Sequence, residues 1–169
     1  MAPTITDTIL EDVMADVFVD LALINGTGSY FLDLDNRVYR YEIRPLEEGS
    51  PDRPYLCLGE TRINPPGGLE EHPNNWEEWN IEFDLYLYVD IDKDTPNLAH
   101  RNLLLGLADV NRAIKVDEGR NELAGNTWIS SITLDTVTSK ETPLLKVAAM
   151  RMTVRISNLR TQRGDMTQR

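Results

Sequence analysis

The chain has 169 residues and a mass of 19.2 kDa, the size of one ordinary domain with a substantial hydrophobic core. Its composition, 41% hydrophobic and 27% charged, excludes wholesale disorder, and no apolar run is long enough to span a membrane. A single cysteine, Cys57, excludes a disulfide framework, and two histidines exclude a histidine-rich metal site. The first residues lack the bases of a signal peptide, so export is not expected.

The net charge of −11 disfavours binding to nucleic acid or to anionic lipid. The charge is also uneven along the chain. Residues 1–36 hold seven acids and no Lys or Arg, whereas residues 143–169 hold six bases and one acid. This asymmetry has two interpretations: charge complementarity within one domain, or head-to-tail attraction between copies.

Two segments have the period of amphipathic helices. In residues 6–24, apolar side chains recur every four residues, and Asn25-Gly26 provides a stop. The second helix begins at Thr95-Pro96, with threonine as N-cap and proline in the first helical position, and ends near Lys115.

Residues 77–92 alternate almost without fault between apolar and polar side chains, which predicts a strand with one dry and one wet face. The dry face runs from Trp79 to Ile91, and the wet face is acidic, with two tyrosines. Such a strand would extend roughly 50 Å, against a usual ~17–20 Å. We therefore expect part of it to project as a long hairpin or to pair with another copy.

Shorter strands are predicted at 30–34, 37–43 and 55–58, with loops at 45–54 and 64–75. Two long strands close the chain. The first, 127–137, is expected to place Trp128, Ser130, Ile132 and Leu134 on one face; the second, 144–157, turns Ala148, Met150, Met152 and Val154 inward.

Together these elements predict an α+β fold, a two-layer sandwich in which two main helices pack on one face of a largely antiparallel sheet with a long projecting hairpin. No internal repeat or domain boundary is visible, so residues 1–169 are expected to form a single domain with a flexible tail at 158–169. The wet face of the sheet is expected to stay exposed or to meet a partner.

Signals for catalysis are weak. The sequence Asp90-x-Asp92-x-Asp94 begins like a calcium loop but lacks the later glycine and glutamate. Gly26-x-Gly28 closes a helix instead of opening one, so turn chemistry explains it better than phosphate binding. No motif organises His72 or His100 as a base, and Cys57 between two leucines is expected to be buried. We therefore predict no catalytic residues, no metal and no cofactor.

The layout resembles the tail terminator proteins of long-tailed bacteriophages, also called minor tail or tail-completion proteins. The resemblance covers about residues 5–158. It is carried by the amphipathic helix at 6–24, the stretch 53–60 (Arg-Pro-Tyr-Leu-Cys-Leu-Gly-Glu), the alternating strand 79–89, Asp94-Thr-Pro-Asn97 with its helix, Trp128–Ile132 and the closing strand 148–155.

This resemblance implies a hexameric ring that caps the tail tube, ends tube polymerisation and joins the tail to the head–neck complex of the virion. It implies contacts with the tube protein and with a neck or head-completion protein, passage of DNA through the bore without specific binding, and no membrane. The loops 45–54 and 64–75 and the tail 158–169 are candidate contacts with tube or neck. Candidates for the lumen or a subunit interface are Glu78, Glu82, Asp84, Tyr86, Tyr88, Arg151 and Arg155.

Two other functions remain open from the sequence. Another phage connector, such as a neck or head-completion protein, would have a similar build and would differ in its partner. A small enzyme or ligand-binding domain would need a concave pocket with converging polar groups.

Overall fold

The computed structural model describes residues 7–64, 78–91, 95–117, 126–140 and 142–157. It has two main helices, α1 (Asp7–Leu21) and α2 (Pro96–Ile114), a short 3-10 turn η1 (Lys115–Asp117), and five strands. The strands are β1 (Val38–Tyr39), β2 (Tyr55–Asn64), β3 (Glu78–Asp90), β4 (Asn126–Ser139) and β5 (Thr142–Ser157). They form one sheet in the order β1-β2-β3-β5-β4, in which only the β1–β2 pair is parallel.

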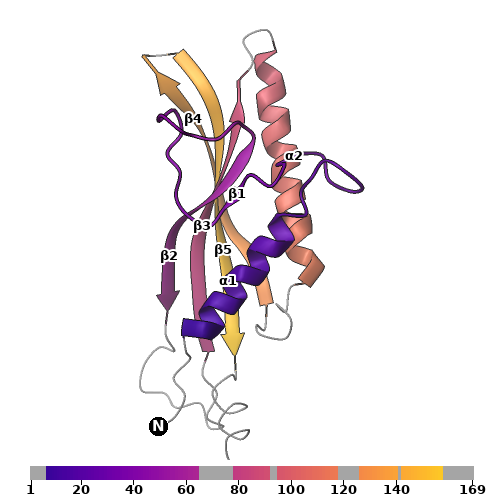
Figure 1. The fold of residues 1–169 in the computed structure, drawn as a ribbon, viewed down its shortest axis with the longest axis vertical. Coiled ribbons are helices and arrows are strands. Elements are labelled where there is room, and N and C mark those ends of the chain that lie inside the picture. Colours follow the sequence, from indigo (N-terminus) through magenta and orange to yellow (C-terminus); the bar gives the residue numbers. More distant parts are fainter. Residues whose placement is uncertain (1–6, 65–77, 92–94, 118–125, 141, 158–169) are drawn as a thin grey trace, which may run out of the picture.

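Both helices lie on the same face of this sheet (Figure 1), which confirms the predicted α+β fold. The helix-side core joins Val13, Val17 and Leu21 of α1 with Leu103 and Val110 of α2. The sheet contributes the predicted dry face of β3 and the inward residues of β5, which are Ile81, Phe83, Leu85, Leu87, Val89, Ala148, Met150, Met152 and Val154. The alternation in the sequence therefore identified the buried face correctly.

The β4–β5 hairpin is long, with strands of 14 and 16 residues that turn at Lys140, where φ is +48°. It extends to one end of the elongated sheet (Figure 1). Every residue of β3 pairs with β5, so the whole length of β3 has a partner strand within the same chain. β2 is also longer than the predicted 55–58, because a bulge between Leu58 and Thr61 lets it continue to Asn64.

The predicted strands at 30–34 and 37–43 are mostly wrong. Only Val38–Tyr39 forms a strand, and a single bridge joins Asn25 to Asp33. The reason lies in α2, where a carboxylate oxygen of buried Asp109 accepts hydrogen bonds from the backbone N–H groups of Phe31 and Leu32, at 2.8 Å each. The backbone N–H groups of Phe31 and Leu32 therefore bind a side chain of α2 and are not available for hydrogen bonds to a neighbouring strand.

The predicted face of β4 is also wrong. Thr127 and Ile129 oppose Val154 and Met152 on the helix side, but a bulge at Ser130 shifts the register, so that Ile132 opposes Met150. An extra residue reverses the parity of side chains beyond it. Trp128 therefore lies on the opposite face of the sheet from Ile132 and Leu134.

Candidate interaction surface

The sheet face turned away from the helices carries the residues that the sequence proposed for a lumen or an interface. We call it the outer face. Strand pairing aligns its side chains in rows from β2 to β5: Arg62–Glu82–Thr153, Cys57–Tyr86–Ala149 and Tyr55–Tyr88–Val147. Asp84 is opposite Arg151, and Arg155 is opposite Asn80. Six of the seven proposed residues thus lie on one face; Glu78 is in β3, but its side chain lies outside the described ones.

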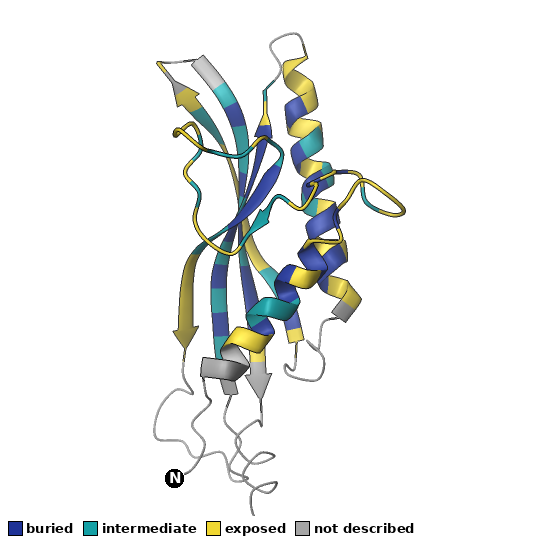
Figure 2. Cartoon of the chain, viewed as in Figure 1, coloured by how far each residue is buried: buried dark blue, intermediate teal, exposed yellow. Residues whose placement is uncertain are grey.

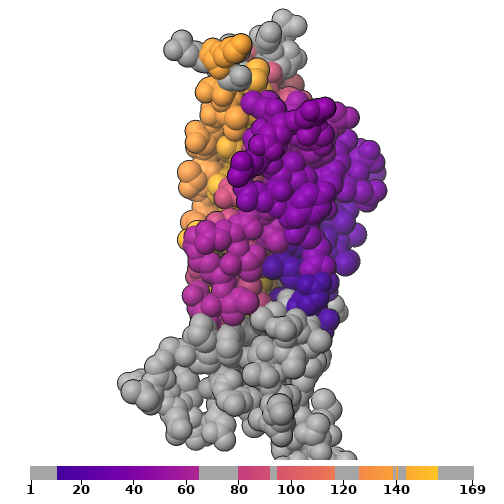
Figure 3. Space-filling view, turned by 60° about the vertical axis from the view of Figure 1, so that its left-hand side comes forward, coloured from indigo at the N-terminus to yellow at the C-terminus, as the bar shows by residue number. Residues whose placement is uncertain are grey.

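One half of the outer face is covered by the irregular segment 40–54 between β1 and β2. We call it the covered half. Its buried cluster consists of Tyr55, Cys57, Tyr88 and Leu145, with Ile43 of the covering segment packed against it. The rings of Tyr55 and Tyr88 lie 5.0 Å apart between centroids. Figure 3 shows this segment as a layer over the sheet, and Figure 2 shows buried residues continuing beneath it.

The expectation that Tyr88 is exposed on a wet face is therefore wrong, because only 8% of its surface is accessible. Tyr86, beside it in β3, is half-buried at the edge of the same cluster. Burial raises the pKa values of both phenols, with a further increase for Tyr86 from the nearby charge of Asp84. Tyr88 thus acts inside the subunit as part of a second core.

Cys57 and Tyr55 are fully buried in this cluster. Burial raises the pKa of the Cys57 thiol to about 11 and that of Tyr55 to about 12. The thiol donates a weak hydrogen bond to the carbonyl oxygen of Ile43, with an S–O distance of 3.8 Å. The prediction that Cys57 is buried is confirmed, and a neutral thiol is a poor nucleophile at ordinary pH.

The other half of the outer face lies beyond the covering segment and is only partly exposed, with Asp84 and Arg151 half-buried and Thr153 buried; we call it the open half. Its described charged side chains are Glu60, Arg62, Glu82, Asp84, Arg151 and Arg155. Arg151 binds Asp84 through two contacts, Nε–Oδ1 at 2.9 Å and Nη2–Oδ2 at 3.4 Å. Arg62 binds Glu60 in the same two-pronged way, at 3.0 and 2.6 Å. The guanidinium of Arg155 lies 5.5 Å from the centroid of the Trp128 ring.

Three acids and three bases share the open half, so its described side chains are close to neutral overall. The bases of β2 and β5 lie beside the acids of β3. The pair of Arg151 and Asp84 forms within one chain. Such a face suits contact with another protein surface at least as well as repulsion of DNA.

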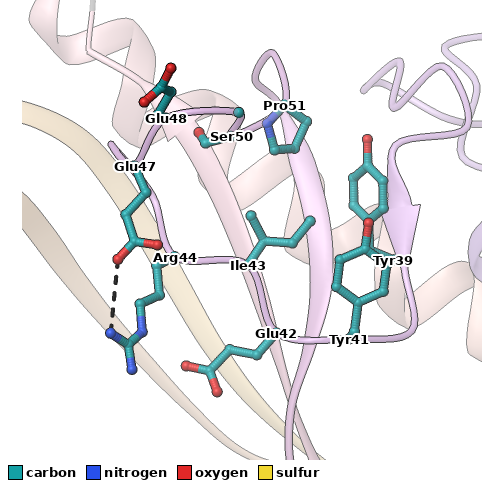
Figure 4. A pocket seen from close by; sticks show the side chains of 10 residues that line it. Tyr39, Tyr41, Glu42, Ile43, Arg44, Glu47, Glu48, Ser50 and Pro51 are labelled. Atoms are coloured by element: carbon teal, nitrogen blue, oxygen red, sulfur yellow. Dashed lines mark ion pairs between the residues drawn. The ribbon is translucent and has the colours of Figure 1, made fainter.

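A shallow pocket of about 320 Å³ lies in the covering segment (Figure 4). It is lined by Tyr39, Tyr41, Glu42, Ile43, Arg44 and residues 47–51, and Arg44 pairs with Glu47 at 3.8 Å. The pocket brings together three carboxylates, two aromatic rings, the Arg44 guanidinium and the Ser50 hydroxyl.

The remaining sequence candidates do not converge on a site. His100 is exposed on α2, and His72 and most of the Asp90–Asp94 run lie outside the described residues. Among the residues that the structure describes, no group of three His, Cys, Asp or Glu side chains could hold a metal ion. No helix in the described part is long and apolar enough to cross a membrane.

Asp109 and Gly59 are structural determinants that the sequence reasoning missed. Asp109 occupies the apolar stripe of α2, three residues after Gly106 and next to Val110, so a carboxylate on a buried helix face was the available signal. Gly59 lies where a Cβ would come within 2.3 Å of the Tyr86 ring, and nothing in the sequence alone indicates this approach.

No protein-family model and no curated protein matches the chain. Among solved structures, it is similar to a chain from the virion of a native gene transfer agent (GTA) particle, with 14% sequence identity and a TM-score of 0.48. The alignment covers 90% of this chain and 100% of that chain. A likeness of this degree does not establish a shared function.

Proposed function

We propose that this chain is a non-enzymatic structural protein of a phage-like virion. In this proposal, identical copies close into a hexameric ring of the tail terminator type at the junction of tail and neck. The ring would cap the tail tube, end its polymerisation and offer a surface to the head–neck complex.

The observation that supports this function is the division of the sheet into two unlike faces. Both helices and the larger core lie on one face, whereas half of the other face remains open and carries ordered ion pairs. A single chain gains little stability from an exposed pair such as Arg62–Glu60. In a ring with helices outside, the same polar face is available to line the lumen or to contact a neighbour.

The build of the fold matches the layout on which the resemblance rests: an N-terminal amphipathic helix, a long alternating strand, a second helix and a closing hairpin. The unequal charge of the two chain ends is compatible with a heterologous interface, in which two different patches meet and the rotation closes.

The test is the mass of the purified full-length chain by light scattering over a concentration series, with electron microscopy of the largest species. Six copies of a 19.2 kDa chain give about 115 kDa, and the proposal expects closed rings of that mass. Rings that bind purified tail tube and limit its growth would identify a terminator, whereas rings that bind only a portal would favour a head-completion connector. A chain that is monomeric or dimeric at every concentration and does not bind purified tail tube would overturn the proposal.

A further inference from the structure

β4 is the last strand of the described sheet. In the described part of the chain, β5 is the one strand that pairs with β4, so about every second residue of this 14-residue strand turns its backbone N–H and C=O groups toward the other side. Natural proteins usually block such an edge with lysine, proline or a short strand. Residues 126–139 contain no Lys, Arg or Pro and are rich in β-branched residues. Such an edge favours pairing with another strand.

A second edge is available on the opposite side of the sheet. β1 pairs with β2 at Leu56 and Cys57 alone, so among the described residues Leu58–Asn64 pairs only with β3. The two edges belong to the same chain and bound the same sheet.

Strand direction makes these two edges compatible. β2, β3, β5 and β4 alternate in direction, since each neighbouring pair is antiparallel. β4 therefore runs opposite to β2, and a strand added antiparallel to β4 runs in the same direction as β2. A second copy placed by simple rotation therefore brings its β2 antiparallel to β4 of the first, and the alternation continues across the boundary.

Side chains at both edges also lack cover on the helix side. Ile132 and Leu134 of β4 are opposite Met150 and Ala148, yet they are 49% and 41% exposed. Ile63 of β2 is opposite Ile81 and is 43% exposed. These aliphatic residues share one face of the sheet, so joining the two edges would let them pack against one another and bury part of their exposed surface.

We propose that neighbouring copies join by antiparallel pairing of the β4 edge (Asn126–Ser139) with the free β2 edge (Leu58–Asn64) of the next copy. The occupant of each edge is a second copy of this chain, and the sheet runs on from subunit to subunit. The contact is heterologous, so repetition can close it into a ring. This inference deepens the proposed function and rests on the ring that it assumes.

The first test places charge on the edge. The double variant Ile132→Lys/Leu134→Lys places two ammonium groups on the β4 side of each contact, and Ile63→Lys separately places one on the β2 side, where pairing would bury them. We expect the concentration at which rings form, measured by sedimentation velocity, to rise roughly tenfold or more. The matched control is Leu23→Lys, whose residue is also 43% exposed but lies away from both edges, and which should leave that concentration within about twofold.

The second test traps the contact covalently. Ile63→Cys is combined in turn with Ile129→Cys, Ile132→Cys or Leu134→Cys, which sample three registers on the helix side of β4. With one cysteine on each edge, oxidation is expected to link the copies by disulfides into a series of oligomers (a ladder) up to the full ring. Each single-cysteine variant can be cross-linked no further than a dimer. Arg62→Cys with Ile132→Cys is the control, because these side chains lie on opposite faces of the sheet.

The outcomes separate the two proposals. Ladders in one register, together with weakened assembly of the lysine variants, support edge pairing. Wild-type rings with unaffected lysine variants and no ladder in any register overturn edge pairing and leave the ring intact. A wild-type chain that forms no closed ring, either alone or on purified tail tube, overturns both.

Discussion

The two halves of the outer face share the same strands but differ in what keeps them in place. In the covered half, Tyr55, Cys57 and Tyr88 are sealed beneath the segment 40–54 and form a second core. In the open half, only four residues before Tyr88 along β3, Asp84 is held by Arg151 in a half-buried pair. The difference shows that period-two alternation determines which way a side chain points, while the rest of the chain determines whether that side becomes covered.

The largest expected effect is at the centre of the covered half. Tyr88→Ala removes a buried ring that packs on Tyr55, so we expect a loss of about 3 kcal/mol in the free energy of unfolding. Glu82→Ala, on the same face of β3 in the open half, should change it by less than about 0.5 kcal/mol. Urea unfolding of both variants provides the comparison. Equal losses would show that the two halves do not differ as described.

Gly59 tests the border between the halves. A Cβ there would lie 2.3 Å from the Tyr86 ring, so Gly59→Ala must displace the ring or the β2 bulge. We expect a loss of about 1–3 kcal/mol in urea unfolding. In the double variant Gly59→Ala/Tyr86→Ala, the clash is absent, and the additional cost of the glycine change should largely disappear. If that cost persists, backbone strain and not the ring is responsible.

Alkaline pH should weaken the covered half selectively. The Cys57 pKa is raised from 9.0 to about 11 in the folded state, so the unfolded chain loses this proton first as the pH rises. The associated stability is therefore complete below pH 9 and decreases as the pH rises toward 11. At pH 10 the expected loss from this thiol is about 1 kcal/mol. Urea unfolding at pH 8 and pH 10 should show a smaller decrease for Cys57→Ala than for wild type.

The smallest effect is expected in the open half. Arg151→Ala breaks a two-pronged but solvent-accessible pair with Asp84. We expect the urea midpoint of the single chain to move less than in Tyr88→Ala or Gly59→Ala, because solvent still screens this partly exposed pair. The double variant Arg151→Ala/Asp84→Ala completes the cycle. A loss comparable to that of Tyr88→Ala would mean that the open half also stabilises the subunit.

Much of the fold was predictable from the sequence because its signals are local. The four-residue period of α1, the Thr95-Pro96 start of α2 and the alternation of β3 each depend on a few neighbouring residues. The fold class followed from these elements, and so did the buried face of β3 and β5. For the candidate site, the sequence placed Glu82, Asp84 and Arg151 on one face, and the structure pairs two of them.

Other features depended on contacts between distant parts of the chain. The bulge at Ser130 reverses the face of Trp128, and no local pattern marks it. Asp109 accepts hydrogen bonds from the backbone N–H groups of Phe31 and Leu32, almost 80 residues away, and prevents the hairpin that their own sequence favours. The cover over Tyr88 comes from residues 40–54. The part of the β2 edge without a described partner begins where β1 ends, and β4 has one described partner strand because it is last in the sheet order. Local composition thus determined the elements and their apolar faces, whereas burial, register and free edges were decided only when remote segments met in the folded chain.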